Sequence, residues 1–297
     1  MNVKTKGVVS GIVGEAAYGI NPLFALPLYA LGWSSDNVLF YRYLIAIFIY
    51  GFWVCFHKQI SLKITLKEAG VLLPLGLLFS VSSVTLFSSY NYMDAGIAST
   101  LLFVYPIMVA IIMTMFFKEK MTLHTLLSII FTSWGVWLLY NGKTDERLNS
   151  TGIILVFFSA LSYALYMVAI KKVPVLQNMN DAKLTFYVIV FGWLLFVGLV
   201  LKGQGVVAVK TPFEAGCLIG LAIFPTIVAL ETITVAIRLI GPTVTAVLGA
   251  FEPLTALVIG VFIFNEQMTF RILCGIVLIL SAVTCVVVAS EKSKTEI

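Results

Sequence analysis

Four ionisable side chains interrupt long apolar runs, and they are the residues whose chemistry stands out first. They are Glu15, Arg42, Glu231 and Glu252. A charge is costly in hydrocarbon, so each should face a partner, an aqueous cavity or the interface. A carboxylate in such a place can carry a proton or pair with an ammonium group.

The composition shows why these charges are conspicuous. Of the 297 residues, 60% are apolar and only 11% are charged, whereas a soluble domain carries about a quarter charged residues. Too little polar surface remains to cover a core in water, so the lipid bilayer is the expected solvent. The net charge of +5 comes from basic residues scattered singly or in pairs, which indicates no nucleic-acid partner. The four cysteines lack CxxC spacing, and the sequence indicates no metal, disulfide or cofactor.

Ten apolar runs have the length of about 20 residues that a helix needs to cross a hydrocarbon core of about 30 Å. The sequence therefore predicts an all-α integral membrane protein with ten transmembrane helices. A removable signal peptide is not expected, because nine similar runs follow the first. The runs are 7–31, 37–56, 69–90, 96–117, 123–140, 152–170, 184–201, 215–236, 242–264 and 269–290.

The basic residues of the short loops predict the orientation. Thirteen of them fall on one side of the ten spans, five fall on the other, and Arg42 lies inside a span. Because positive loops stay in the cytoplasm, both termini are expected there. A bias that holds across alternate loops also favours an even number of helices.

The two halves of the chain repeat. A shift of 147 positions aligns 95–122 with 242–269, which places Pro106 on Pro253 and Glu119 on Glu266. Residues 1–147 and 148–297 are thus predicted to be two five-helix units. Five is an odd number, so the second unit enters the membrane from the opposite face as an inverted repeat. Such repeats are a known route to alternating access in secondary transporters. The alternative is that duplication merely builds a stable ten-helix bundle.

The second repeat carries a recognisable pattern: R-L-I-G-P from Arg238, F-E-P from Phe251 and N-E-Q from Asn265. Over essentially the whole chain it resembles the EamA-type drug/metabolite transporter superfamily. The resemblance implies a multi-pass exporter in the bacterial inner membrane, whose substrate is a small metabolite such as an amino acid, or a drug. The first repeat has Tyr105 where the second has Glu252, so a role of that glutamate is not symmetric.

Glu252 is the leading functional acid. It lies ten residues into its span, which at 1.5 Å per residue is about 15 Å deep and near the midplane. Pro253 cannot donate a backbone hydrogen bond, so a carbonyl one turn earlier should be open to a ligand or water. Glu252 then carries a coupling proton or pairs with the substrate. The alternative is a glutamate that packs neutral and braces the kink.

Further polar side chains share helical faces that point to a common cavity. Glu15, Tyr18 and Pro22 lie at i, i+3 and i+7 on one face. The alternative is that these hydroxyls join helices by interhelical hydrogen bonds. Prolines 22, 106 and 253 are expected to kink their helices. The predicted substrate-cavity residues are Glu15, Tyr18, Asn21, Ser99, Tyr105, Ser162, Tyr163, Tyr166, Thr245 and Glu252, and the kinks are Pro22, Pro106 and Pro253.

Two charges near the predicted cytoplasmic face suggest a gate, and a third charge does not. Glu231 and Arg238 are seven residues apart on one helical face, and the alternative for both is solvation at the interface. Arg42 begins near the outer face and is expected to extend to it. The polar run from Ser80 to Ser89 either lines water or bonds helix carbonyls.

Other functional classes fit less well. An integral-membrane enzyme needs a nucleophile and base or metal ligands, yet the two histidines, His57 and His124, lie at separate loops without ligand partners at helical spacing. No GxSxG, Walker or HExxH motif occurs, so an enzyme is not predicted. A channel or receptor stays an alternative from composition, and the repeat favours a carrier of a small-molecule substrate over both.

Overall fold

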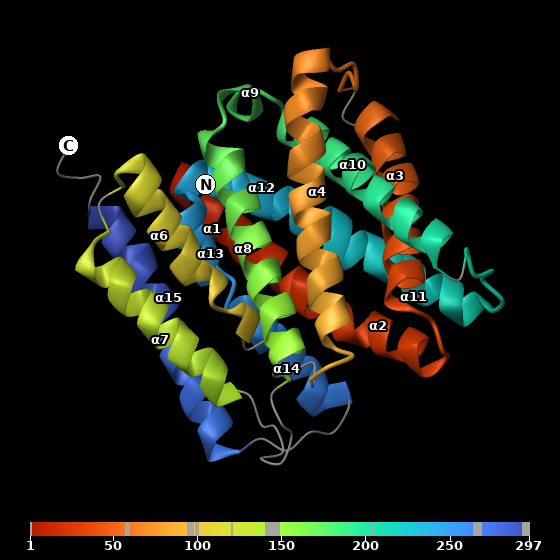
Figure 1. Cartoon of the computed structure of the whole chain (residues 1–297). Coiled ribbons are helices and arrows are strands. Elements are labelled where there is room, and N and C mark those ends of the chain that lie inside the picture. The colour runs from red at the N-terminus through yellow and green to blue at the C-terminus, as the bar shows by residue number, and fades with distance from the viewer. Residues whose placement is uncertain are drawn as a thin grey trace.

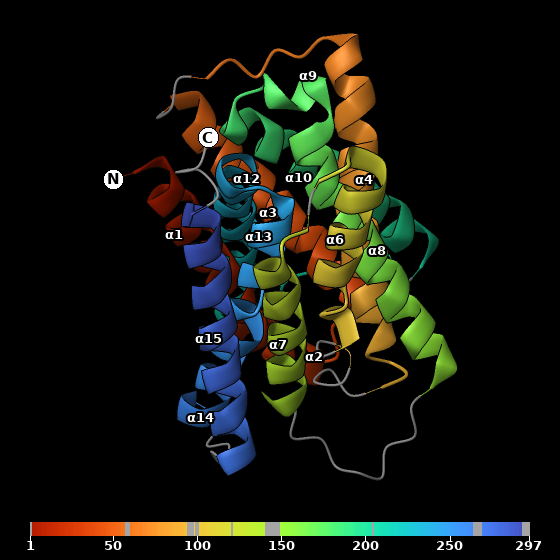
Figure 2. The same ribbon diagram turned by 90° about the vertical axis from the view of Figure 1, so that its left-hand side faces the viewer.

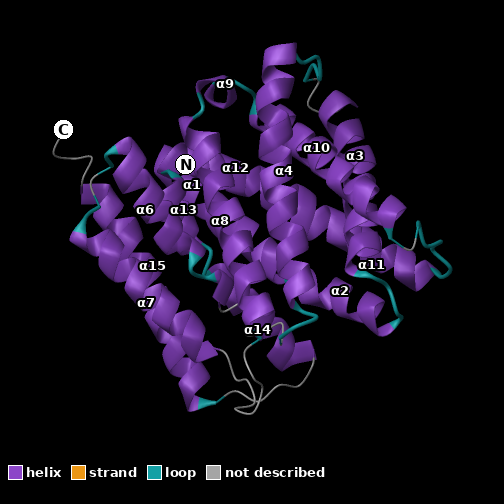
Figure 3. Ribbon diagram, in the orientation of Figure 1, coloured by secondary structure: helices purple, strands orange, loops and turns teal. Residues whose placement is uncertain are grey.

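The computed structural model describes residues 2–56, 60–93, 98, 101–119, 121–139, 149–203, 205–263 and 269–292. Within these ranges every regular element is helical, and Figure 3 shows helices joined by short loops. Seven described segments are long and apolar enough to cross a membrane, and Tyr105–Phe117, Leu123–Leu138 and Phe270–Cys285 are shorter apolar helices. The chain is therefore an all-helical, multi-pass membrane protein. The count of ten spans stays a prediction.

The helices follow one another in two series along the chain. The first comprises α1 (Val3–Gly19), α2 (Asn21–Ala30), α3 (Ser35–Phe56), α4 (Leu66–Ser89), α6 (Tyr105–Phe117) and α7 (Leu123–Leu139). The second comprises α8 (Ser150–Lys172), α9 (Pro174–Gln177), α10 (Asp181–Lys202), α11 (Pro212–Ala222), a π-helical stretch (Ile223–Val228), α12 (Ala229–Ile240), α13 (Pro242–Leu248), α14 (Phe251–Ile263) and α15 (Phe270–Lys292).

Packing between the two series is symmetric. α1, the first helix of the first series, packs on α12 and α14. α8, the first helix of the second series, packs on α4 and α6. The contact of α10 with α4 likewise corresponds to that of α3 with α11. α3 with α10 and α7 with α15 pair directly with their counterparts, and Figures 1 and 2 show α7 beside α15 at one edge. Each main contact thus maps onto another when the halves are exchanged.

The first helices of the two halves run in opposite directions. In both Figure 1 and Figure 2 the chain begins near the upper part of the molecule and descends through α1 to α2. In the same views α8 rises from the lower edge to α9 at the top.

A stripe of small residues lets α1 approach the second half closely. A methyl group added at Gly7, Gly11 or Gly14 would lie 2.6 Å from a side-chain carbon of Ile240, Leu248 or Ile233 respectively. Real carbon contacts are about 3.5 to 4.0 Å, so no larger residue fits there without movement. The G-x-x-x-G spacing of Gly7 and Gly11 thus serves close helix packing.

The helices α4 and α11 begin with the same capping box. The amide of Glu68 donates to the Thr65 hydroxyl at 3.2 Å, and the amide of Glu214 donates to the Thr211 hydroxyl at 3.1 Å. In return each glutamate accepts from its threonine's backbone amide, so two orphan donors are satisfied per helix. Both caps read T-x-x-E-A-G, at positions 146 residues apart.

Candidate functional site

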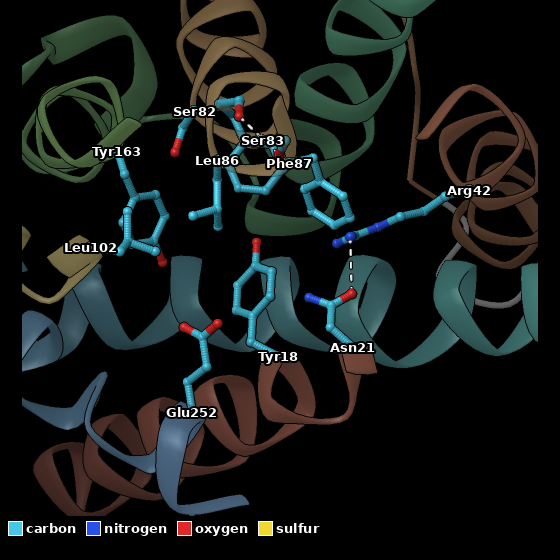
Figure 4. Close-up of a pocket in the computed structure, with 11 residues that line it drawn as sticks. Tyr18, Asn21, Arg42, Ser82, Ser83, Leu86, Phe87, Leu102, Tyr163 and Glu252 are labelled. Carbon is cyan, nitrogen blue, oxygen red and sulfur yellow. Dashed lines mark hydrogen bonds between the residues drawn. The ribbon is translucent and has the colours of Figure 1, made fainter. Parts of the chain in front are cut away.

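A cavity lies between helices of the two halves. Its volume is about 60 Å³. Tyr18, Asn21 and Arg42 stand on one side and Glu252 and Tyr163 on another, as Figure 4 shows. The remaining lining residues are Phe79, Ser82, Ser83, Leu86, Phe87 and Leu102.

Regular helix is interrupted where the chain passes the cavity. α1 ends at Gly19 and α2 begins at Asn21, while α13 and α14 are separated by Gly249 and Ala250. The π-helical stretch Ile223–Val228 interrupts a third segment. In a membrane such irregular backbone is tolerated where it is buried in protein or lines a cavity. Broken helices of this kind form the binding sites of many transporters.

The three predicted kink prolines each open a helix after an interruption. Pro22 is the second residue of α2, Pro106 is the second residue of α6, and Pro253 is the third residue of α14. Proline fits there because first-turn amides have no intrahelical acceptor. The prediction of an open carbonyl one turn before Pro253 is wrong. That carbonyl belongs to Gly249, and its oxygen accepts a hydrogen bond of 3.0 Å from the Glu252 amide.

Arg42 reaches into the protein and not toward the outer interface. Its side chain is on α3, and the residue is only 2% exposed. The guanidinium donates from Nε to the Thr226 hydroxyl at 2.6 Å and from Nη2 to the Pro225 carbonyl at 2.6 Å. It also donates from Nη1 to the Asn21 side-chain oxygen at 3.1 Å, as Figure 4 shows. The prediction that Arg42 extends to the interface is therefore wrong, since the π-helical stretch and α2 supply acceptors inside.

Two carboxylates lie near each other in the centre of the molecule. Glu252 lines the cavity, and Glu15 is buried with 1% of its surface exposed. Neither oxygen of Glu15 has a hydrogen-bond partner among the described residues. The two acids interact electrostatically, and Glu252 also interacts with the charge of Arg42. The site thus combines one cationic and two acidic groups away from bulk water.

Aromatic side chains of both halves surround these charges. Tyr18 of α1 and Tyr163 of α8, which are repeat counterparts, both line the cavity. The rings of Tyr105 and Tyr163 meet edge to face at 5.0 Å, and those of Tyr163 and Tyr166 stack at 6.0 Å. The hydroxyl of Tyr18 is buried and has no hydrogen-bond partner among the described residues.

The other predicted cavity residues have different places. Thr245 donates to the Gly241 carbonyl one turn earlier at 2.8 Å, which is a bond within its own backbone segment. Ser162 is buried on α8, and Ser99 lies outside the described residues. Of the predicted set, the cavity lining includes Tyr18, Asn21, Tyr163 and Glu252, while Glu15, Tyr105, Ser162, Tyr166 and Thr245 are buried outside that lining.

The two predicted gate residues lie on α12. Arg238 forms an ion pair of 2.5 Å with Asp181 and donates to the carbonyls of Leu176 and Met179, both at 2.5 Å. It thereby ties the end of α12 to α9, to the beginning of α10 and to the turn between them. Glu231 lies beside the Tyr50 hydroxyl. A gating role for this pair stays a prediction.

The cavity residues that the sequence interpretation missed come mainly from α3 and α4. The serine run of α4 was a usable signal, because Ser82 and Ser83 line the cavity. Two other hydroxyls of that run bond carbonyls of their own helix, Thr85 to Val81 at 2.7 Å and Ser89 to Leu86 at 2.6 Å. Both explanations of the run therefore apply, and Ser83 shows both, since it lines the cavity and donates to the Phe79 carbonyl at 3.2 Å.

Comparison with known proteins decides the family. The model of the EamA-like transporter family matches residues 5–141 and 150–288. The chain belongs to this family. As an EamA-like protein it is similar to an uncharacterized transporter of Haemophilus influenzae, at 25% identity over 61% of this chain and 60% of that protein. It is also similar to the uncharacterized transporter YvbV of Bacillus subtilis, at 24% identity over 79% of this chain and 76% of that protein.

The chain therefore spans less than two thirds of the length of the Haemophilus relative. A solved crystal structure superposes on this EamA-like chain with a TM-score of 0.81, covering 97% of this chain and 98% of the other. At 12% identity that likeness shows a common fold alone. Within the described residues, no group of three histidine, cysteine or acidic side chains is placed to hold a metal ion. Membership of the EamA-like family and the two similar transporters indicate a membrane transporter.

Proposed function

We propose that this EamA-like protein is a secondary transporter that exports a small metabolite, such as an amino acid or a related compound, or a drug. The observation that carries the proposal is a cavity lined by polar groups of both halves at the points where helices break. Binding sites of secondary transporters have this construction. The bacterial inner membrane, with both termini in the cytoplasm, is the proposed location.

The proposed architecture is ten spans in two inverted five-helix units, 1–147 and 148–297. Two observations support it: the contacts between helices map onto one another when the halves are exchanged, and α1 and α8 run in opposite directions. Two copies of one unit in opposite orientations can exchange conformations, which opens the cavity alternately to each face.

Glu252 is proposed as the residue that couples charge to transport. It lines the cavity, and the nearby Glu15 supplies a second carboxylate that has no hydrogen-bond partner among the described residues. Two close acids in a low-dielectric site disfavour a double negative charge, so such a pair can take up and release a proton. A proton is therefore the proposed coupling ion, and the substrate's ammonium group is the other candidate partner of Glu252.

The proposal is tested by metabolite profiling of the medium from cells with and without the protein, followed by efflux from loaded vesicles. We expect at least one compound to accumulate reproducibly outside and its efflux to saturate with concentration. Efflux should slow when the proton gradient is dissipated, and unchanged efflux would exclude proton coupling. No change for any solute in either direction would refute transport, while flux that does not saturate would favour a channel.

A further inference from the structure

The Arg42 guanidinium has more donors than its protein partners use. A guanidinium presents five N–H groups in a planar fork, and three of them are bonded, to Thr226, Pro225 and Asn21. Two N–H groups thus have no acceptor among the described residues. The described carboxylates form no ion pair with Arg42, although it is 98% shielded from solvent by the protein. A buried charge of this kind is costly unless an anion comes to pair with it.

Further donors converge on the same end of the cavity. The Asn21 side-chain oxygen accepts from Arg42, so its amide nitrogen is directed away from the guanidinium, as Figure 4 shows. Tyr18 stands between Asn21 and Glu252 in that view, and its hydroxyl has no partner among the described residues. Three helices, α1, α2 and α3, thereby present a guanidinium, an amide and a hydroxyl to one small volume.

The other walls have a different chemistry. Phe79, Leu86, Phe87 and Leu102 give the cavity an apolar wall, and Glu252 supplies the acid. A guanidinium matches a carboxylate well, because the two planar groups can form two parallel hydrogen bonds. The apolar wall can pack against the hydrocarbon part of a ligand, and the carboxylate of Glu252 can pair with an amino group of the ligand.

We propose that Arg42 binds the carboxylate of the transported molecule, and that the substrates are small carboxylates with an apolar body. An amino group on the same molecule faces Glu252 and strengthens binding. This assignment rests on the proposed transport function and narrows it, because cationic or neutral compounds without an anionic group would leave Arg42 without a direct ion pair. Asn21 and Tyr18 position the carboxylate by donating to it.

The experiment measures binding to the purified full-length chain in lipid nanodiscs by isothermal titration. The probes are leucine, leucinamide, 4-methylpentanoate and 3-methylbutylamine, which share a body and differ in their charged groups. We expect leucine to bind at least tenfold more tightly than leucinamide or 3-methylbutylamine, and 4-methylpentanoate to fall between, since losing a partner of a buried charge weakens binding strongly.

Three variants separate recognition from a merely structural role. Arg42→Gln should abolish the preference for the free acid, but it also removes bonds to the π-helical stretch. Asn21→Asp keeps an oxygen at the position that accepts from Arg42 and places a negative charge there, so the fold stays and carboxylate binding falls at least tenfold. Arg271→Lys is the matched control, because Arg271 contacts Trp137 and does not line the cavity; its binding should equal that of the unchanged chain.

The outcomes keep this assignment apart from the transport proposal. Equal binding of leucine and leucinamide, or an acid preference that survives Asn21→Asp in folded protein, overturns the role of Arg42. Saturable export of a compound without an anionic group also overturns it while leaving transport intact. A preference for the free acid that disappears in Asn21→Asp supports it, whether or not export is detected in cells.

Discussion

The Tyr105 hydroxyl donates a hydrogen bond of 3.2 Å to the Ala246 carbonyl and joins equivalent segments of the two repeats. Tyr105 opens α6, and Ala246 lies in α13 just before the interruption at Gly249 and Ala250. Only glycine fits this contact, because a methyl group at Gly249 would overlap the Tyr105 hydroxyl and lie 2.8 Å from its ring carbon Cζ. The two halves therefore meet directly beside the helix break that carries Glu252.

Gly249→Ala should damage the protein at this contact. The methyl group displaces Tyr105 and α6, and overpacking of this kind costs about 1 to 3 kcal/mol of the free energy of unfolding. The measurement is denaturation in a detergent titration, with efflux as a second readout. Gly216→Ala is the matched control: a methyl group there meets nothing within 4 Å, so stability should be unchanged or slightly higher. Equal stability of the two variants would contradict the proposed contact.

Glu252→Gln should reduce efflux at least tenfold and flatten its dependence on pH. The amide keeps the size of the side chain but can neither carry a proton nor neutralise an ammonium group. The measurement is efflux from vesicles across a pH series. Glu68→Gln is the control, because Glu68 pairs with Lys183 at 3.2 Å at the beginning of α4, away from the cavity. Wild-type rates at every pH in Glu252→Gln would leave this glutamate the role of bracing the break.

Much of the architecture could be predicted from the sequence because lipid constrains it. Apolar length predicts spans, and the prolines at 22, 106 and 253 predict interruptions, since a proline amide cannot donate inside a helix. The resemblance to EamA-type transporters is confirmed by the family match. The capping boxes at Thr65 and Thr211 are also visible in the sequence as the pattern T-x-x-E-A-G. They begin helices at equivalent positions of the two repeats.

The position of Arg42 could not be predicted in this way. Counting residues from the end of a span gives the depth of a side chain but not the direction in which it points. Its acceptors, Pro225 and Thr226, are 183 and 184 residues away and belong to a π-helical stretch whose register differs from that of an α-helix. Only the tertiary structure brings them to the guanidinium. The cationic group of the cavity therefore comes from Arg42, a residue whose side chain was predicted from the sequence to extend to the membrane interface.

Arg238→Lys should destabilise the end of α12. A lysine can keep one of the interactions that Arg238 makes. It cannot bind Asp181 and the carbonyls of Leu176 and Met179 at the same time. The expected loss is about 1 to 2 kcal/mol, because these groups are only partly buried. Detergent titration measures it, with Arg271→Lys as the control at an exposed arginine. If both variants unfold at the same point, Arg238 does not tie these segments together.

Access to the cavity should come from the outer face. Ser82 to Phe87 lie in the second half of α4, which the predicted topology places toward that face, whereas the glycine stripe of α1 packs closely on α12 and α13. In a chain without its four native cysteines, a membrane-impermeant maleimide added outside should label Ser83→Cys, and substrate should slow the reaction. Ser80→Cys is the matched control, because Ser80 is fully buried on the same helix and should not react. Labelling of Ser83→Cys only from the cytoplasmic side would reverse the predicted orientation, and equal labelling of both positions would refute the cavity.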